Sequence, residues 1–322
     1  MILVTGAGGF IGSHVVEHLL NRGYSVRAMV HYNSMDSIGW LTEISESKAT
    51  KLEIVYGDLV DFDLMEKVAK GVESIINLGA LIPIPYSYEA PRSYVATNLN
   101  GVINLLEILR RHGGRLVQIS TSEVFGSAKF IPINESHPRN AQSPYAATKV
   151  AADELLKSYV SSFAINATIA RPFNTFGPRQ STRAVIPTII AQALKSNVIE
   201  LGDVTTTRDF NYVFDTVTGI EAVMNFGLPG EDYNIGSGIE RNIPEIVNSV
   251  QRALGKELTI NVDQSRVRPE KSEVRQLICD SSKLKQIASW SSEHTKPENF
   301  DSTIENLVSW YTQNQPMRDF RL

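Results

Sequence analysis

The segment "VTGAGGFIG" (residues 4–12) is rich in glycine and joins the apolar run "ILV" to an apolar-periodic stretch over residues 10–22. Gly6, Gly9 and Gly12 at this spacing let the backbone approach a pyrophosphate at a helix N-terminus. Phe10 and Ile11, between the last two glycines, belong to the same predicted contact. The alternative is a glycine turn needed only for close strand–helix packing. We predict a dinucleotide-binding turn.

Short apolar runs alternate with amphipathic stretches beyond this turn: "SVRAMV", "KLEIVYG", "SIINLGA", "RLVQIST" and "NATIARP". This alternation is typical of βαβ units on a parallel sheet with helices on both faces. We predict an α/β fold with a doubly wound parallel sheet (Rossmann) over residues 1–172, to which about 212–236 return. The regularity breaks after Pro172, so residues 173–211 and 237–322 are predicted to form a smaller, partly interleaved α/β substrate lobe.

The composition narrows the class of protein. The 322 residues are 42% hydrophobic and 20% charged, as expected of one globular body with a sizeable core. A net charge of −4 offers no broad basic surface, so we expect no nucleic-acid partner. No apolar run approaches membrane-spanning length. The single cysteine, Cys279, cannot form an internal disulfide and no leader precedes "ILVTG", so we expect a cytoplasmic protein.

The end of the second predicted strand bears on the choice of cofactor. An acidic residue there would bind the adenosine 2′-hydroxyl, but residues 30–34 read "VHYNS" and Asp36 lies too late. Without that carboxylate a 2′-phosphate is not repelled, and Asn33 and Ser34 can donate hydrogen bonds to it. We therefore favour NADP slightly over NAD. Asp58, after the third strand, is placed to meet the adenine amino group or to cap the next helix.

A tyrosine and a lysine four residues apart form the second chemical signal. In "SPYAATK" (143–149), Tyr145 and Lys149 lie on one face of a predicted helix. A lysine ammonium lowers the pKa of a tyrosine and can hold a ribose hydroxyl, which makes the phenolate a base for an alcohol proton. Alone, such a pair is usually a surface contact. Here it follows a strand that ends in Ser120 and Thr121.

The glycine turn, the Ser/Thr strand end and Tyr145-x-x-x-Lys149 together resemble the extended short-chain dehydrogenase/reductase superfamily, whose catalytic Tyr and Lys work beside a Ser or Thr. The resemblance covers nearly the whole chain and includes "TNLNGVINLLE" (97–107), "ARPFNTFGPRQ" (170–180), "TRDFNYVFD" (207–215) and "YNIGSG" (233–238). It implies a tightly bound nicotinamide cofactor, a nucleotide-sugar substrate and a homodimer packed through helices near 92–111 and 143–163. The predicted cofactor site is completed by Leu59, Ala80, Asn98 and Pro172. We expect no metal ion.

The group beside Thr121 separates the members of this superfamily. Enzymes that only oxidise and re-reduce carbon 4 of a sugar have no glutamate there, whereas those that remove the carbon-5 proton do. Glu123 can take that proton, because a 4-keto group acidifies it. The 4,6-dehydratases have Thr-Asp-Glu, and their Asp protonates the departing C6 hydroxyl. This chain has Ser122 between Thr121 and Glu123, as nucleotide-glucuronate decarboxylases do. A single Glu123 can serve as base and then as acid; its alternative role is a structural cap.

Four further segments resemble the LegB-type branch of bacterial sugar dehydratases: "ALIPIPYSY" (80–88), "STSEVFGSA" (120–128), "RPFNTFGPRQSTRAVIPTII" (171–190) and "RPEKSEVRQL" (268–277). That branch acts on nucleotide-linked N-acetylglucosamine on the way to legionaminic- or pseudaminic-type sugars. We therefore favour a UDP-N-acetylglucosamine 4,6-dehydratase. The alternatives are a UDP-glucuronate decarboxylase, a UDP-hexose 4-epimerase and a dinucleotide-sensing protein. Intact Thr121, Tyr145 and Lys149 argue against the last.

The resemblance also implies contacts to the rest of the substrate. Asn174 would approach the diphosphate, which Arg208 and Arg268 would neutralise, since a guanidinium can pair two phosphate oxygens. Each arginine alone is more often a solvated surface charge. The remaining predicted substrate contacts are Val185, at the base, and Tyr86 and Ser87, for the sugar. Ordinary loop packing is the alternative for the last two.

Overall fold

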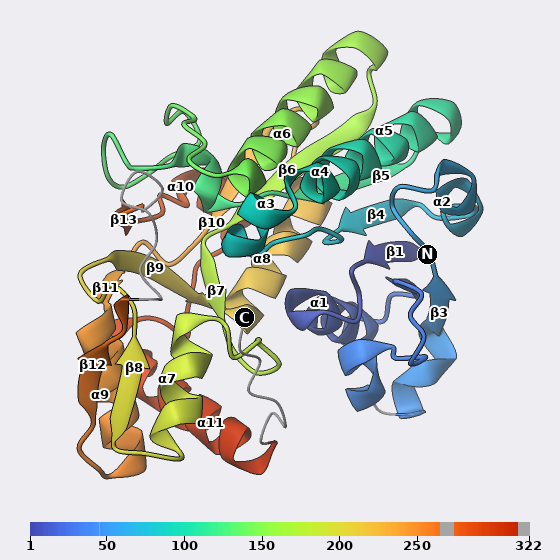
Figure 1. Cartoon of the computed structure of the whole chain (residues 1–322). Helices are drawn as coiled ribbons and strands as arrows, with labels where there is room; N and C mark the ends of the chain where they lie inside the picture. Colours follow the sequence, from blue (N-terminus) through green and yellow to red (C-terminus); the bar gives the residue numbers. More distant parts are fainter. Residues whose placement is uncertain (45, 265–273, 315–322) are drawn as a thin grey trace.

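The computed structural model describes residues 1–44, 46–264 and 274–314. Its main element is a seven-stranded sheet in the order β10-β6-β5-β4-β1-β2-β3, with parallel neighbours throughout (Figure 1). The strands are β1 (Ile2–Thr5), β2 (Val26–Val30), β3 (Leu52–Tyr56), β4 (Ser74–Asn77), β5 (Arg115–Ile119), β6 (Asn166–Pro172) and β10 (Asp232–Ile235). The predicted doubly wound parallel sheet is confirmed.

Helices cover both faces of this sheet, which is why its central strands read as continuous apolar runs. One face is packed by α1 (Phe10–Asn21), α8 (Val213–Phe226) and α10 (Ser282–Ala288), and the other by α2 (Phe62–Val68), α5 (Gly101–His112) and α6 (Pro144–Phe163). Residues 213–235, which form α8 and β10, therefore lie with the large sheet. So does α10, whose Leu284 is buried in the same core, although the sequence assigned that segment to the second lobe.

Short helical segments join these elements, and all but η2, which leads into the start of β3, follow the carboxyl ends of strands. They are η1 (Gly39–Glu43), η2 (Glu46–Lys51), α3 (Ile84–Glu89), α4 (Pro91–Tyr94), η3 (Val95–Asn100) and η4 (Ser122–Phe125). The turn η3 is π-helical, and such turns occur frequently at functional sites. No helix in the described part of the chain is both long and apolar enough to cross a membrane.

The second lobe has its own sheets and core. Its strands are β7 (Asn174–Phe176), β9 (Thr207–Tyr212), β11 (Glu240–Asn242) and β13 (Gln276–Leu277), with β8 (Val198–Leu201) and β12 (Thr259–Val262) as a separate parallel pair. Its helices are α7 (Val185–Ala193), α9 (Ile243–Leu254) and α11 (Pro297–Gln313). Figure 1 shows this lobe beside the carboxyl end of the large sheet, where β6 leads directly into β7.

A buried polar chain ties together three strand ends at that edge. The hydroxyl of Thr5 donates to the Asn77 side chain at 2.5 Å, and Asn77 Nδ2 donates to Gln118 Oε1 at 2.7 Å. The register pairs Thr5 with Asn77 and Asn77 with Gln118, so the bonds run straight across β1, β4 and β5. Satisfied hydrogen bonds offset the cost of burying these groups and hold the edge that carries the candidate site.

Candidate active site

The turn after β1 leaves no room for a side chain at Gly6 and Gly12. A Cβ on Gly12 would lie 2.2 Å from the Gly6 carbonyl oxygen, and Gly6 itself has a φ of 62°. Helix α1 begins at Phe10 without a side-chain cap. The first-turn amides of a helix have no intrahelical acceptor, so those of Phe10 and Ile11 can receive a diphosphate. The turn fits a dinucleotide, as the sequence predicted.

The loop after β2 differs from the predicted 2′-phosphate site. Asn33 Oδ1 accepts hydrogen bonds from the amides of Met35 and Ser37, and its Nδ2 donates to the Ser37 carbonyl at 2.8 Å. The side chain therefore holds its own loop and is not free to donate to a phosphate. Ser34 is exposed. Asp36 accepts a hydrogen bond from the Tyr56 hydroxyl across the neighbouring strand.

Asp58 lies at the end of β3, where the adenine was predicted to bind. Its Oδ1 accepts from the Val60 amide at 3.1 Å, and its Oδ2 lies 3.4 Å from His31 Nε2. Helix α2 is capped by another residue, Asp61, which accepts from the Leu64 amide. The helix-cap alternative for Asp58 is therefore not what the structure shows.

The predicted catalytic pair is buried at the start of α6. Ser143 caps this helix by accepting from the Ala146 amide, and Pro144 occupies its first turn. This start places Tyr145 and Lys149 on the face toward the end of β5, with 7% and 4% of their surface exposed. Lys149 Nζ donates to the Ile119 carbonyl at 2.7 Å, which leaves two of its three protons for other acceptors.

Burial dominates the electrostatics of this pair. It raises the pKa of Tyr145, which a hydrogen bond with the Thr121 side chain opposes and the Glu123 carboxylate reinforces. Burial lowers the pKa of Lys149 to about 8. To take a proton from an alcohol, Tyr145 must ionise. Lys149 should therefore keep its own proton, because a nearby cation offsets the cost of a buried phenolate.

The segment "TSE" forms the start of η4 and brings Thr121 and Glu123 to Tyr145. Thr121 caps the turn by accepting from the Glu123 amide at 3.3 Å. The capping role considered for Glu123 therefore belongs to Thr121 in this turn. Ser122 is buried and Glu123 is half-buried. The structure thus gathers Thr121, Glu123 and Tyr145 with Lys149 at the end of β5.

An aromatic wall adjoins Tyr145. The ring of Tyr94 lies 6.2 Å from Tyr145, and the ring of Tyr86 lies 6.2 Å from Tyr94. Tyr86 is 45% exposed and remains a candidate sugar contact, whereas Ser87 is fully buried and its hydroxyl donates to the Ile84 carbonyl at 2.6 Å. The hydroxyl of Ser87 is therefore used within helix α3, which favours the packing alternative for this residue. Tyr94 was not predicted from the sequence, although it lies one helical turn before Asn98.

Three further predicted cofactor residues, Asn98, Leu59 and Pro172, lie near the ends of β4 and β6. Asn98 accepts from the Leu81 amide and donates to the Leu81 carbonyl, so it fixes the segment next to Ala80 after β4. Leu59 is buried against Gly79, because a Cβ added to Gly79 would lie only 2.7 Å from Leu59 Cδ1. Pro172 ends β6.

The second lobe places part of the predicted substrate set near this edge. Asn174 begins β7, and its buried Oδ1 has no hydrogen-bond partner among the described residues. This amide therefore retains hydrogen-bonding capacity for a ligand. Arg208, on β9, is 8% exposed and donates to the carbonyls of Thr207 and Arg275. Val185 begins α7. Arg268 lies outside the described residues.

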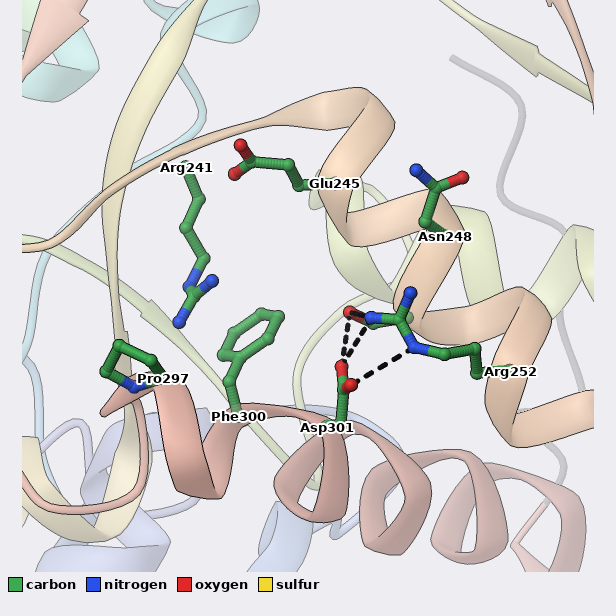
Figure 2. A pocket seen from close by; sticks show the side chains of 8 residues that line it. Arg241, Glu245, Asn248, Arg252, Pro297, Phe300 and Asp301 are labelled. Atoms are coloured by element: carbon green, nitrogen blue, oxygen red, sulfur yellow. Dashed lines mark hydrogen bonds and ion pairs between the residues drawn. The ribbon is translucent and has the colours of Figure 1, made fainter.

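A cavity of about 220 Å³ lies in the second lobe between α9 and α11 (Figure 2). Arg252 on its wall is paired with Asp301 at 2.7 Å. The guanidinium of Arg241 stacks 3.7 Å above the Phe300 ring and donates to the Thr295 carbonyl. None of the predicted site residues that the structure describes lines this cavity, whose charged groups pack α9 against α11.

The family model described as GDP-mannose 4,6 dehydratase matches residues 3–303. The chain belongs to this family. It is 28% identical to a dTDP-glucose 4,6-dehydratase of Mycolicibacterium smegmatis over 99% of this chain and 96% of the relative. It is also 32% identical to a putative UDP-glucose 4-epimerase of Methanocaldococcus jannaschii, over 98% and 99% of the two chains.

Solved structures show the same range of activities. A dTDP-glucose 4,6-dehydratase from Streptomyces venezuelae, with NAD and TYD bound, superposes with a TM-score of 0.86 at 28% identity over 98% of this chain and 97% of its own. A UDP-glucuronic acid 4-epimerase from Bacillus cereus, in complex with UDP-glucuronic acid and NAD, has a TM-score of 0.87 at 28% identity, with 97% and 99% covered.

These comparisons confirm two predictions. The chain belongs to the epimerase/dehydratase branch of the short-chain dehydrogenase/reductase superfamily, and it is an NAD(P)-dependent nucleotide-sugar enzyme. The preference for NADP is not supported, because these neighbours were solved with NAD. The substrate, the homodimer and the roles of individual residues stay predictions.

Proposed function

We propose that this member of the GDP-mannose 4,6 dehydratase family is a UDP-N-acetylglucosamine 4,6-dehydratase that retains NAD. The observation that carries the proposal is a carboxylate, Glu123, placed by η4 close enough to Tyr145 to raise the pKa of its phenol. A plain 4-epimerase has no use for a second base beside its tyrosine. A dehydratase needs one, because its substrate must lose the carbon-5 proton.

Each group has a distinct role in this reaction. Tyr145 takes the proton of the 4-hydroxyl, Thr121 holds the same oxygen by hydrogen bonding, and Lys149 supplies the positive charge that favours the phenolate. A nicotinamide bound here would supply the acceptor for the hydride of carbon 4 and the donor for its return, so no cofactor would be consumed. Glu123 removes H5 and, once protonated, donates that proton to the departing C6 hydroxyl, which leaves as water.

The product depends on where the hydride returns. Return to carbon 6 gives a 4-keto-6-deoxy sugar, and return to carbon 4 gives a 5,6-alkene. Either product of an N-acetylglucosamine nucleotide would serve nonulosonic acid biosynthesis of the pseudaminic or legionaminic type.

A UDP-glucuronate decarboxylase is the second candidate, and Ser122 is the observation that favours it. A serine cannot act as the acid that the dehydratases place at this position, and loss of carbon dioxide needs no such acid. A UDP-hexose 4-epimerase leaves Glu123 without a role. A dinucleotide-sensing protein leaves Thr121, Tyr145 and Lys149 without one.

Incubation of the protein with UDP-N-acetylglucosamine, without added cofactor, tests the proposal directly. NMR of the product should show a 4-keto-6-deoxy sugar or a 5,6-alkene, and Tyr145→Phe provides the inactive control. Conversion to the galacto isomer would establish an epimerase. Carbon dioxide from UDP-glucuronate in a parallel reaction would establish the decarboxylase.

The proposal includes a homodimer formed through α5 and α6. Two exposed apolar side chains support it, Val95 at the start of η3, which leads into α5, and Phe163 at the end of α6, at 43% and 49% exposure. Light scattering of the eluted protein should give twice the mass of the chain, and a mass of one chain would contradict this part of the proposal.

A further inference from the structure

Three charged side chains are buried together beneath the candidate site. Arg171 on β6 has no exposed surface; its Nη1 donates to Asp153 Oδ2 at 2.8 Å and its Nη2 donates to Asp232 Oδ2 at 2.7 Å. Asp153 is 1% exposed and Asp232 is 4% exposed. Apolar residues of the same size would often stabilise a fold equally well, so a buried network of this kind suggests a role beyond stability.

The network touches both elements that hold Lys149. Tyr145, Lys149 and Asp153 occupy successive turns of α6 at a spacing of four, so they lie along one face. At the end of β5, the Ser120 hydroxyl donates to Asp153 Oδ2 at 2.8 Å and accepts from Arg171. Ser120 directly follows Ile119, whose carbonyl accepts from Lys149 Nζ. Asp153 and Arg171 therefore tie the helix of Lys149 to the strand end against which its ammonium group rests.

We propose that Asp153 is a positioning residue that keeps the Lys149 ammonium charged and held against the Ile119 carbonyl. Asp153 pairs with Arg171 Nη1, whereas Asp232 pairs with Arg171 Nη2 and also, at 3.2 Å each, with Lys157 and Arg139. Asp153 is therefore the carboxylate of this network that lies on the helix of Lys149. The effect of this arrangement on turnover rests on the proposed function, because the proposed reaction requires Lys149 to be a cation.

The charges around Lys149 act in opposite directions. Burial lowers its pKa to about 8, Asp153 raises it, and Arg171 lowers it. The titratable groups around this stretch are Asp153 and Tyr145 on α6, Arg171 on β6, Glu123 on η4 and Tyr94 on α4. Of these groups, Asp153 is the one whose negative charge raises the pKa of Lys149, so its removal should lower that pKa further.

Asp153→Asn and Asp232→Asn form a matched pair for the test. Each removes one carboxylate partner of Arg171, but only Asp153 lies on the face of α6 that carries Lys149. The pKa of Lys149 is measured by NMR of protein grown with ¹³C-labelled lysine, its signal being assigned by its loss in Lys149→Arg. Asp153→Asn should lower this pKa by about one unit, as the loss of a neighbouring opposite charge does. The alkaline limb of the turnover profile should move with it.

Asp232→Asn should lower the melting temperature while moving the Lys149 titration by only a small fraction of that shift. An unmoved titration in Asp153→Asn, or equal shifts in the two variants, would overturn the inference. If Asp153→Asn does not fold, Asp153→Ser, which is smaller and also uncharged, takes its place: a Lys149 pKa about one unit below that of wild type supports the inference, and an unmoved pKa overturns it. The titration needs no substrate, so inactivity on UDP-N-acetylglucosamine would count against the proposed function alone.

Discussion

His14, on the helix that follows the glycine turn, should make the protein lose stability as the pH falls. The side chain is 3% exposed, lies between the rings of Phe10 and Phe214, and forms a 2.8 Å hydrogen bond from Nδ1 to the Phe10 carbonyl. Burial lowers its pKa from 6.5 to about 4, and the nearby Arg179 adds to that effect. Between these two values the unfolded chain binds a proton that the folded chain does not, so stability falls with pH.

The magnitude follows from the shift. A gap of about 2.5 pKa units corresponds to about 3.4 kcal/mol below both pKa values, of which about 2 kcal/mol is lost by about pH 5. Urea denaturation of wild type and His14→Gln from about pH 7.5 to pH 5 measures it, because glutamine does not titrate. The free energy of unfolding of wild type should fall more steeply, by about 2 kcal/mol over this range.

The control for this prediction is His294→Gln. A hydrogen bond with Asp215 raises the pKa of His294, so this histidine contributes stability that is present at low pH and lost as the pH rises through its folded pKa. The two variants should therefore change the pH dependence in opposite directions. Parallel curves for wild type and His14→Gln would refute the reasoning.

Three further predictions concern the candidate site. Tyr145→Phe should fold and bind nucleotides as wild type does yet lose turnover by ~10²–10⁴-fold, and near-normal turnover in a steady-state assay would remove Tyr145 as the base. Protein stripped of cofactor should bind NAD more tightly than NADP by calorimetry, because Asn33 is committed to its own loop; the reverse order would restore the preference first drawn from the sequence. Tyr86→Ala should raise KM for the sugar nucleotide, whereas Ser87→Ala should leave KM unchanged and cost about 1 kcal/mol of stability, as loss of one hydrogen bond does; equal KM values for the two variants would contradict the assignment of Tyr86.

Local patterns in the sequence were sufficient for the sheet and for the centre of the site. Three features each depend on residues that are close together in the sequence: the glycine turn, the spacing of Tyr145 and Lys149, and the strand end before Thr121. The parallel sheet follows from the alternation of strand and helix patterns, and its carboxyl edge then brings these segments together. Glu123 was singled out for the same reason, as a carboxylate at the end of a buried strand.

Features that depend on the three-dimensional path of the loops were not predictable in this way. Asn33 and Ser87 were taken as ligand contacts, but each side chain hydrogen-bonds to backbone groups two to four residues away. Arg171 and Asp232 are 61 residues apart and meet only because β10 pairs with β6. Leu284 joins the core of the first lobe for a similar reason, since α10 packs on α8 and β10.

The removal of H5 by Glu123 is the central claim, and exchange with heavy water tests it most directly. Wild-type protein given UDP-N-acetylglucosamine in heavy water should form a 4-keto-6-deoxy product with deuterium at carbon 5, or a 5,6-alkene without H5. Glu123→Gln keeps the shape of the side chain but cannot accept the proton. This variant should therefore bind the substrate and return it with H5 intact and without loss of water. Dehydration by Glu123→Gln at the wild-type rate, or a wild-type product that keeps its original H5, would contradict the account.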